Sequence, residues 1–155
     1  MSIGIIVYSE TGNTYSVATE IKNKLTKKGH NVTIEQIELK KNSLPKKKDI
    51  ILKKAPKIEQ YDVVIFGSPV HAFTLAPAFK IYLDQIESLK YKKIACYVTQ
   101  HLPYSWLGGN NAIQKMLKIT KTKGAIILRT EVINWSNKKR EQMIEQLASS
   151  FSSIL

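Results

Sequence analysis

An apolar run that passes directly into a hydroxyl-rich turn and then into a helical pattern constrains this chain more than any other feature. Residues 3–8 form the run, and the turn after it contains Ser9, Thr11, Gly12, Asn13 and Thr14. Apolar side chains then recur at helical spacing, at Val17, Ala18, Ile21 and Leu25. A strand that opens straight into a helix leaves backbone N–H groups free at the positive end of the helix dipole, and such an end captures phosphate.

The turn contains no Lys or Arg, so a phosphate would be held there by neutral N–H and O–H donors. The alternative is an ordinary capped turn between a strand and a helix, because Ser and Thr are common helix caps. Both interpretations stay open on the residues alone. Glu10 is the only carboxylate in the turn, and because a negative charge beside a phosphate is unfavourable, we expect it to point to solvent.

The rest of the chain alternates short β-type runs with helical patterns, which favours a parallel α/β sheet with helices on both faces. The patterns predict strands over 3–8, 31–37, 62–67, 93–99 and 124–133, and helices over 13–28, 75–89, 111–122 and after Ser136. The third strand is apolar throughout and should be central. A short helix is expected near 49–54. We expect 1–155 to form a single domain.

The charge is large and uneven. The chain has 24 Lys and Arg residues against 12 Asp and Glu residues, a net charge of +12. Eight lysines fall within residues 40–57, with Asp49 as the only acid of that central run: Lys40, Lys41, Lys46, Lys47, Lys48, Lys53, Lys54 and Lys57. Such a segment attracts acidic surfaces. It is also consistent with a solvated segment whose lysines only aid solubility.

The single cysteine and the hydropathy pattern indicate the cellular compartment in which the protein is expected to work. Cys96 lies inside the apolar run 94–98, so no disulfide framework is possible and a buried, inert thiol is expected. One cysteine suits a reducing environment. No signal peptide or membrane-spanning run is visible, so a cytoplasmic location without membrane association is expected.

Three predicted loops should meet at the carboxyl ends of the strands, where open parallel sheets bind ligands. They cover residues 9–14, 68–74 and 100–110. The second and third carry aromatic side chains, at His71, Phe73, Tyr104 and Trp106. Aromatic loops beside a phosphate cradle indicate a flat ring held between side chains. A phosphate at one end and a flat heterocycle at the other describe a mononucleotide.

Other site classes lack their residues. The sequence has no Gly-x-x-x-x-Gly-Lys-Ser/Thr loop and no Gly-x-Gly-x-x-Gly fingerprint. A receiver domain would need an Asp at the end of the third strand, which here ends in Gly67-Ser68. No Cys/His spacing suggests a metal, and no triad or paired carboxylates are visible. The chemistry is therefore expected to belong to a cofactor.

With these loops in order, the chain resembles the flavodoxin-like family, which binds FMN. The resemblance is carried by the segment Tyr8-Ser-Glu-Thr-Gly-Asn-Thr14, by residues 61–70 with Ala76-Pro77-Ala78-Phe79, and by Gly108-Gly109-Asn110. It implies a five-stranded parallel sheet in the order 2-1-3-4-5. It also implies that the phosphate is held by Ser9, Thr11, Gly12, Asn13 and Thr14. The ring would lie against Ser68, Pro69, Val70, His71, Ala72 and Phe73 on one side. On the other side it would meet Thr99, Gln100, His101, Tyr104, Trp106, Gly108 and Gly109.

Two departures from the family pattern matter. Flavodoxin carriers are usually acidic, whereas this chain is basic, so the resemblance implies an acidic redox partner that docks on residues 40–57. Many members also have glycine in the loop after the third strand. In those members a peptide of this loop flips when the flavin gains a proton. Residues 70–74 contain no glycine, and a flip into positive φ is costly for residues with a Cβ, so we expect a less stabilised semiquinone than in ordinary carriers.

The resemblance implies FMN-dependent electron transfer. One alternative is an enzyme of the same fold that uses a reduced nicotinamide cofactor to reduce quinones or similar acceptors. A third hypothesis is a basic binder of nucleic acid or acidic membranes that has lost the flavin. The third is disfavoured because the lysines lack interleaved aromatic residues and any nucleic-acid motif.

Overall fold

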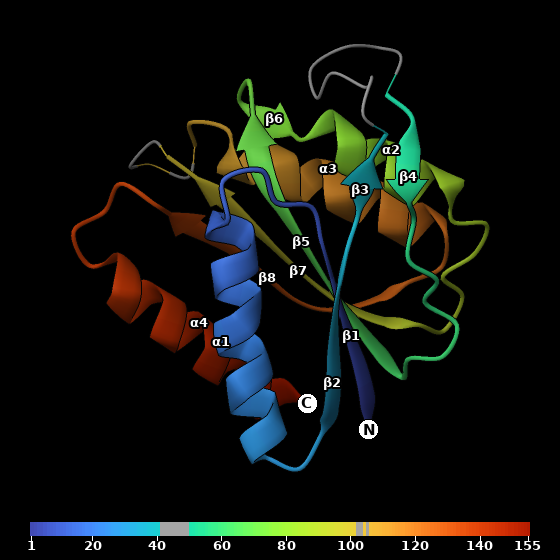
Figure 1. Ribbon diagram of the computed structural model, residues 1–155, viewed down its shortest axis with the longest axis horizontal. Helices are drawn as coiled ribbons and strands as arrows, with labels where there is room; N and C mark the ends of the chain where they lie inside the picture. The colour runs from blue at the N-terminus through green and yellow to red at the C-terminus, as the bar shows by residue number, and fades with distance from the viewer. Residues whose placement is uncertain (41–49, 102–103, 105) are drawn as a thin grey trace.

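The computed structural model describes residues 1–40, 50–101, 104 and 106–155. Within these residues the main sheet has five parallel strands, β1 (Ser2–Val7), β2 (Asn31–Gln36), β5 (Val63–His71), β7 (Lys93–Gln100) and β8 (Ile126–Asn134). Their order is β2-β1-β5-β7-β8 (Figure 1). This confirms the predicted α/β class and the predicted order 2-1-3-4-5.

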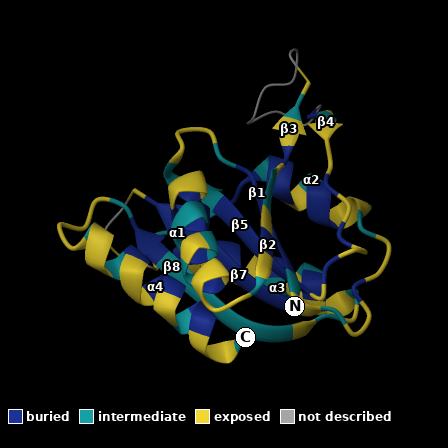
Figure 2. Ribbon diagram, turned by 60° about the horizontal axis from the view of Figure 1, so that its bottom comes forward, coloured by how far each residue is buried: buried dark blue, intermediate teal, exposed yellow. Residues whose placement is uncertain are grey.

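Two helical layers cover the sheet. Helices α1 (Asn13–Lys27) and α4 (Arg140–Ile154) pack on one face, and α2 (Pro77–Gln85) and α3 (Gly109–Thr122) pack on the other (Figure 1). Side chains of β1 alternate between the layers, with Ile5 facing α1 and α4 and Ile6 facing α2 and α3. Figure 2 shows buried residues along the strands between the layers.

The expected short helix at 49–54 is wrong for the described residues. Strand β3 (Glu38–Leu39) pairs in antiparallel fashion with β4 (Leu52–Lys54) instead. Ile50 is buried, Ile51 is exposed and Leu52 packs against the core, so burial alternates with the period of a strand. The lysines at 41, 46, 47 and 48 and Asp49 lie outside the described residues.

The predicted loop 68–74 is largely a hairpin. Strand β5 continues to His71 and turns back into β6 (Thr74–Leu75), with Val70 opposite Leu75 and His71 opposite Thr74. This register leaves a two-residue turn in which Ala72 and Phe73 have φ of 47° and 63°. Tight two-residue hairpins of this kind require positive φ whichever residues occupy them, so the segment already has the backbone conformation that is costly for residues with a Cβ. The expected weak stabilisation of the semiquinone stays a prediction.

Helix α2 is shorter than the predicted range 75–89. Ile86 is extended, and its carbonyl oxygen accepts a hydrogen bond from Lys123 Nζ at 2.5 Å. The Leu89 amide donates to the Lys123 carbonyl at 2.8 Å, and the Leu89 side chain is buried. The tertiary contacts of this extended segment therefore override its helical pattern. No helix of the described residues combines the length and apolar character needed to cross a membrane.

Candidate functional site

The β1–α1 turn presents an open helix end. Gly12 stands at the N-cap of α1 with φ of 91°, no side chain caps it, and the first helical turn contains no acidic residue. The first intrahelical bond runs from the Ser16 amide to the Gly12 carbonyl, so the amides of Asn13 and Thr14 precede the helical ladder. Ser9 Oγ accepts a hydrogen bond from the next amide, that of Tyr15, at 3.3 Å. The amides of Asn13 and Thr14 therefore offer neutral donors to an anion at the positive end of the helix dipole.

Two buried hydrogen bonds fix this helix end against β7. The hydroxyl oxygens of Thr14 and Thr99 lie 2.9 Å apart and share a hydrogen bond. Tyr97 Oη donates to the Thr14 carbonyl oxygen at 2.7 Å, and the Tyr97 ring is fully buried. The end of β7 therefore positions the first turn of α1.

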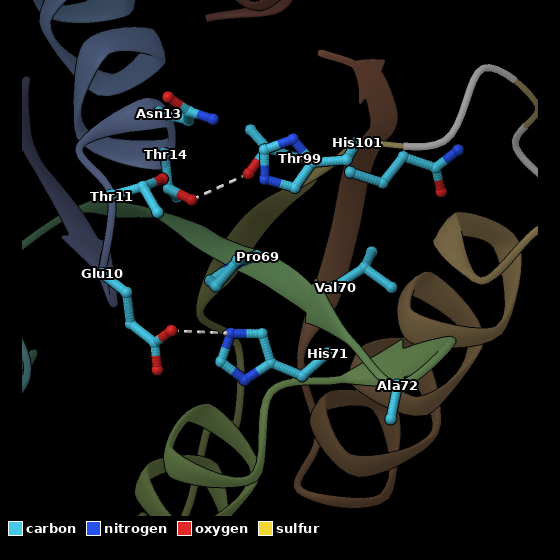
Figure 3. A pocket seen from close by; sticks show the side chains of 11 residues that line it. Glu10, Thr11, Asn13, Thr14, Pro69, Val70, His71, Ala72, Thr99 and His101 are labelled. Atoms are coloured by element: carbon cyan, nitrogen blue, oxygen red, sulfur yellow. Dashed lines mark hydrogen bonds and ion pairs between the residues drawn. The ribbon is translucent and has the colours of Figure 1, made fainter. Parts of the chain in front are cut away.

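A cavity of about 270 Å³ lies between the start of α1 and the carboxyl ends of β5 and β7 (Figure 3). It is lined by Glu10, Thr11, Asn13, Thr14, Pro69, Val70, His71, Ala72, Thr99, Gln100 and His101. All of these except Glu10 are residues that the sequence predicts as a binding site. The described walls contain no Lys or Arg. The described residues also contain no group of three or more His, Cys, Asp or Glu side chains placed to hold a metal ion.

A second hollow of about 230 Å³ adjoins the first. Its walls are Val70, Ala72, Phe73, Gln100, His101 and Leu107, and they are mainly apolar. Phe73, one of these wall residues, is 60% exposed. Because the two hollows share four wall residues, they provide a polar end beside α1 and an apolar end beside the hairpin. That division suits a ligand with a phosphate and a flat ring.

Several predicted residues line neither hollow: Ser9, Gly12, Ser68, Tyr104, Trp106, Gly108 and Gly109. Ser68 is fully buried and donates its hydroxyl to the Pro69 carbonyl oxygen. Tyr104 and Trp106 are exposed and stack on each other, with ring centroids 5.7 Å apart. Ser9 and Gly12 shape the β1–α1 turn described above.

The glycines at the start of α3 act through close packing. Gly108 has φ of 121°, and a Cβ there would lie 2.7 Å from the Phe73 Cα atom. At Gly109 a Cβ would lie 2.5 Å from the side-chain oxygen of Gln100. These glycines therefore bring α3 against the hairpin and β7, and the site depends on them indirectly.

Gln100 connects three segments at the end of β7. Its Nε2 atom donates to the Tyr104 carbonyl oxygen and to Asn134 Oδ1, both at 2.6 Å. The Trp135 amide donates to the Gln100 carbonyl oxygen. Sequence reasoning missed Asn134, which ends β8 and supports the site from behind. The sequence gives little indication of this role, because Asn134 is a single polar residue just after a predicted strand.

Glu10 is exposed, as expected, but its carboxylate also pairs with two side chains, which the sequence did not predict. Its Oε2 atom lies 3.3 Å from His71 Nε2, and its Oε1 atom accepts a hydrogen bond from Tyr8 Oη at 2.7 Å (Figure 3 shows the pair with His71). Burial, followed by the hydrogen bond and charge of Glu10, raises the pKa of Tyr8 well above its ordinary value. Because β1 pairs in parallel with β5 and Val7 lies opposite Gly67, Glu10 and His71 emerge from neighbouring strands.

The cavity lies at the point where the strand order reverses, between β1 and β5, which is where doubly wound α/β proteins bind nucleotides. The sequence matches the family model of the NADPH-dependent FMN reductases over residues 1–139. The chain therefore belongs to this flavodoxin-like family, which confirms the predicted family and its FMN cofactor. No curated protein matches the sequence.

Solved structures share the fold. Flavodoxin 1 from Bacillus cereus has a TM-score of 0.72 at 20% identity, with 100% of this chain and 99% of that chain covered. Flavodoxin 2 from the same organism gives 0.69 at 21% identity, with both chains covered completely. A flavoprotein from Lactobacillus acidophilus, solved in complex with FMN, has a TM-score of 0.65 at 16% identity, with 91% of this chain and 97% of that chain covered.

Proposed function

We propose that this protein transfers electrons through FMN bound in the cavity at the start of α1. The observation that carries the proposal is the glycine-capped, acid-free first turn of α1 directly beside an apolar hollow. When bound, FMN supplies the electron chemistry, and the chain binds it, orients it and limits its contact with water. The neutral donor set of the turn fits a phosphate, and the hairpin side of the cavity fits a flat ring.

The residues divide by position. Thr11, Asn13 and Thr14 would contact the phosphate, with Ser9 and Gly12 shaping their turn. Pro69, Val70, His71 and Ala72 would face one side of the ring, and Thr99, Gln100 and His101 the other. Phe73, Tyr104 and Trp106 would form the rim, and Ser68, Gly108 and Gly109 would support the walls from behind.

Two activities are consistent with this site. The family model favours oxidation of a reduced nicotinamide, with quinones or similar molecules as acceptors, and the exposed Phe73 leaves the apolar hollow accessible to them. We favour a carrier, because the solved structures that share the fold over nearly the whole of both chains include two flavodoxins. Steady-state oxidation of NADPH by the holoprotein, with and without a quinone, separates the two.

We also propose an acidic redox partner. Of the lysine-rich segment, the structure describes Lys40, Lys53, Lys54 and Lys57, and Lys53 and Lys54 are exposed on β4. The β3–β4 hairpin follows the carboxyl end of β2, the sheet edge that holds the cavity (Figure 1). Positive charge near the cofactor would steer an acidic partner to it.

We also propose a cytoplasmic location, which is supported by the free, buried Cys96.

FMN binding is tested by fluorescence quenching with the apoprotein, in parallel with riboflavin, which lacks the phosphate. We expect FMN to bind more tightly than riboflavin. Thr11→Ala with Asn13→Ala should weaken FMN binding by about tenfold or more, because hydrogen bonds to a charged group are lost, and should change riboflavin binding little. Thr26→Ala, an exposed change near the far end of α1, is the matched control. Unchanged FMN fluorescence, or equal losses for both flavins, would reject the proposal.

A further inference from the structure

The wall of the cavity contains a charge cluster that flavin binding alone does not require. Glu10 lies between Tyr8, which donates to Oε1, and His71, whose Nε2 atom is 3.3 Å from Oε2. The His71 side chain is only 12% exposed, and that of Glu10 is 33% exposed. The Tyr8 and His71 rings meet edge to face, with centroids 6.3 Å apart. A carboxylate and an imidazole thus share one partly water-shielded wall of the proposed FMN site.

The titratable and charged groups of the described elements near the hairpin complete the surroundings of this pair. From β1 and its turn come Tyr8 and Glu10, and from the end of β7 comes His101, which lines the same cavity. On α2, Lys80 is paired with Asp84 at 2.8 Å. The first turn of α3 contains no charged residue. Tyr8 remains a protonated donor through the neutral pH range, because its pKa is raised.

We propose that His71 and Glu10 act as one ionisable pair, and that reduction of bound FMN is coupled to protonation of His71. The inference rests on the proposed function, because it needs FMN in this cavity. His71 is a positioning and charge-compensating residue here, and the cluster that holds it consists of Glu10 and Tyr8.

The charge balance gives the direction of the coupling. Two electrons and one proton, added at N5, leave the ring system with one negative charge. With His71 neutral, the pair carries the negative charge of Glu10 and repels that ring; with His71 protonated, the pair is neutral overall and its cation lies at the cavity wall. Reduction therefore favours uptake of a second proton, by the imidazole of His71. The electrons come from dithionite in the test and from the redox partner in function.

The test uses the holoprotein with ¹³C-labelled histidine, followed by NMR from pH 5.5 to 8.5, first oxidised and then reduced anaerobically with dithionite. We expect the titration midpoint of His71 to rise by about one pH unit on reduction, which is about a tenfold gain in proton affinity. Coupling is reciprocal, so the midpoint potential of bound FMN should depend more steeply on pH in the native protein than in His71→Gln.

Glu10→Gln isolates the carboxylate, because glutamine still accepts the hydrogen bond from Tyr8. We expect this variant to lower the His71 midpoint in both redox states. His30, on the turn between α1 and β2, is the internal control, and its NMR signal should not respond to reduction or to Glu10→Gln. A His71 midpoint that is unaffected by reduction in FMN-loaded protein, or by Glu10→Gln, overturns the inference and leaves the proposed function intact. Failure of FMN to bind at all overturns the proposed function, and this inference with it.

Discussion

At the scale of single residues, the site is held by hydrogen bonds that cross between elements distant in the sequence. Tyr97 is the clearest case, because its phenol donates from β7 to the Thr14 carbonyl oxygen in the first turn of α1. The ring is fully buried, and burial raises the pKa of Tyr97 well above its ordinary value, so the phenol remains a donor. This bond sets the helix end that would bind phosphate.

Tyr97→Phe should lower the free energy of unfolding by about 1–2 kcal/mol, because a buried hydrogen bond is lost with little change in shape. It should also weaken FMN binding, since the first turn of α1 loses an anchor. Urea unfolding and FMN fluorescence measure the two effects. Tyr91→Phe is the matched control, because Tyr91 is 76% exposed. A similar loss in both variants would contradict this role for the Tyr97 phenol.

At the scale of elements, the site depends on how closely α3 approaches the β5–β6 hairpin. Gly108 lies where a Cβ would be 2.7 Å from Phe73 Cα and 2.9 Å from a Val70 methyl carbon. Asn111 Nδ2 donates to the Phe73 carbonyl oxygen at 3.2 Å from the same helix end. The hairpin that forms one wall of the cavity is thus seated on the first turn of α3.

Gly108→Ala should lower the free energy of unfolding by about 2–4 kcal/mol, because the new methyl group adds a backbone clash to the cost of positive φ. Gly29→Ala has the same sign of φ, at 90°, but nothing within 4 Å of its Cβ, so it should lose only about 1–2 kcal/mol. Thermal and urea unfolding compare the pair. FMN binding should weaken only in Gly108→Ala, and equal behaviour of the two variants would refute the packing argument.

The sequence predicted the sheet and its order well, because the alternation of apolar runs with helical patterns is a local signal. The hairpins were missed for two reasons. Residues 68–74 contain no Asn-Gly or Asp-Gly turn, and the strand signal at 50–54 is short and rich in lysine. The pairing of Glu10 with His71 follows from the parallel register of β1 and β5, which no local pattern encodes. Site residues set by strand ends were therefore predictable, and contacts set by register were not.

At the scale of the whole molecule, burial on both faces of the sheet links stability to alkaline pH. Cys96 is fully buried in β7, and burial raises the pKa of its thiol to about 12. The unfolded thiol ionises near pH 9, so above that pH the unfolded chain binds fewer protons than the native one. Stability then falls as the pH rises from about 9 toward 12. Buried tyrosines such as Tyr97 add to the loss above about pH 10.

Cys96→Val removes one of these groups while keeping an apolar side chain of similar size. Between pH 9.5 and 11 the native protein should lose up to about 1.4 kcal/mol more per pH unit than the variant. From pH 6 to 8 the difference between the two proteins should stay constant. Urea unfolding across this range measures the free energy of unfolding of both proteins. Lysine titration affects the two proteins equally and therefore cancels in their difference. If the difference in the free energy of unfolding stayed constant up to pH 11, burial would not raise the pKa of the Cys96 thiol in the native protein.

The neutral cradle at the start of α1 has a practical consequence for handling the protein. Its described walls contain no Lys or Arg, so added salt has no lysine–phosphate contact to weaken there. The attraction of the lysines exposed on β4 is instead screened beyond a Debye length of about 3 Å at 1 M salt. High-salt chromatography should therefore strip bound macromolecules from this basic chain and leave it yellow.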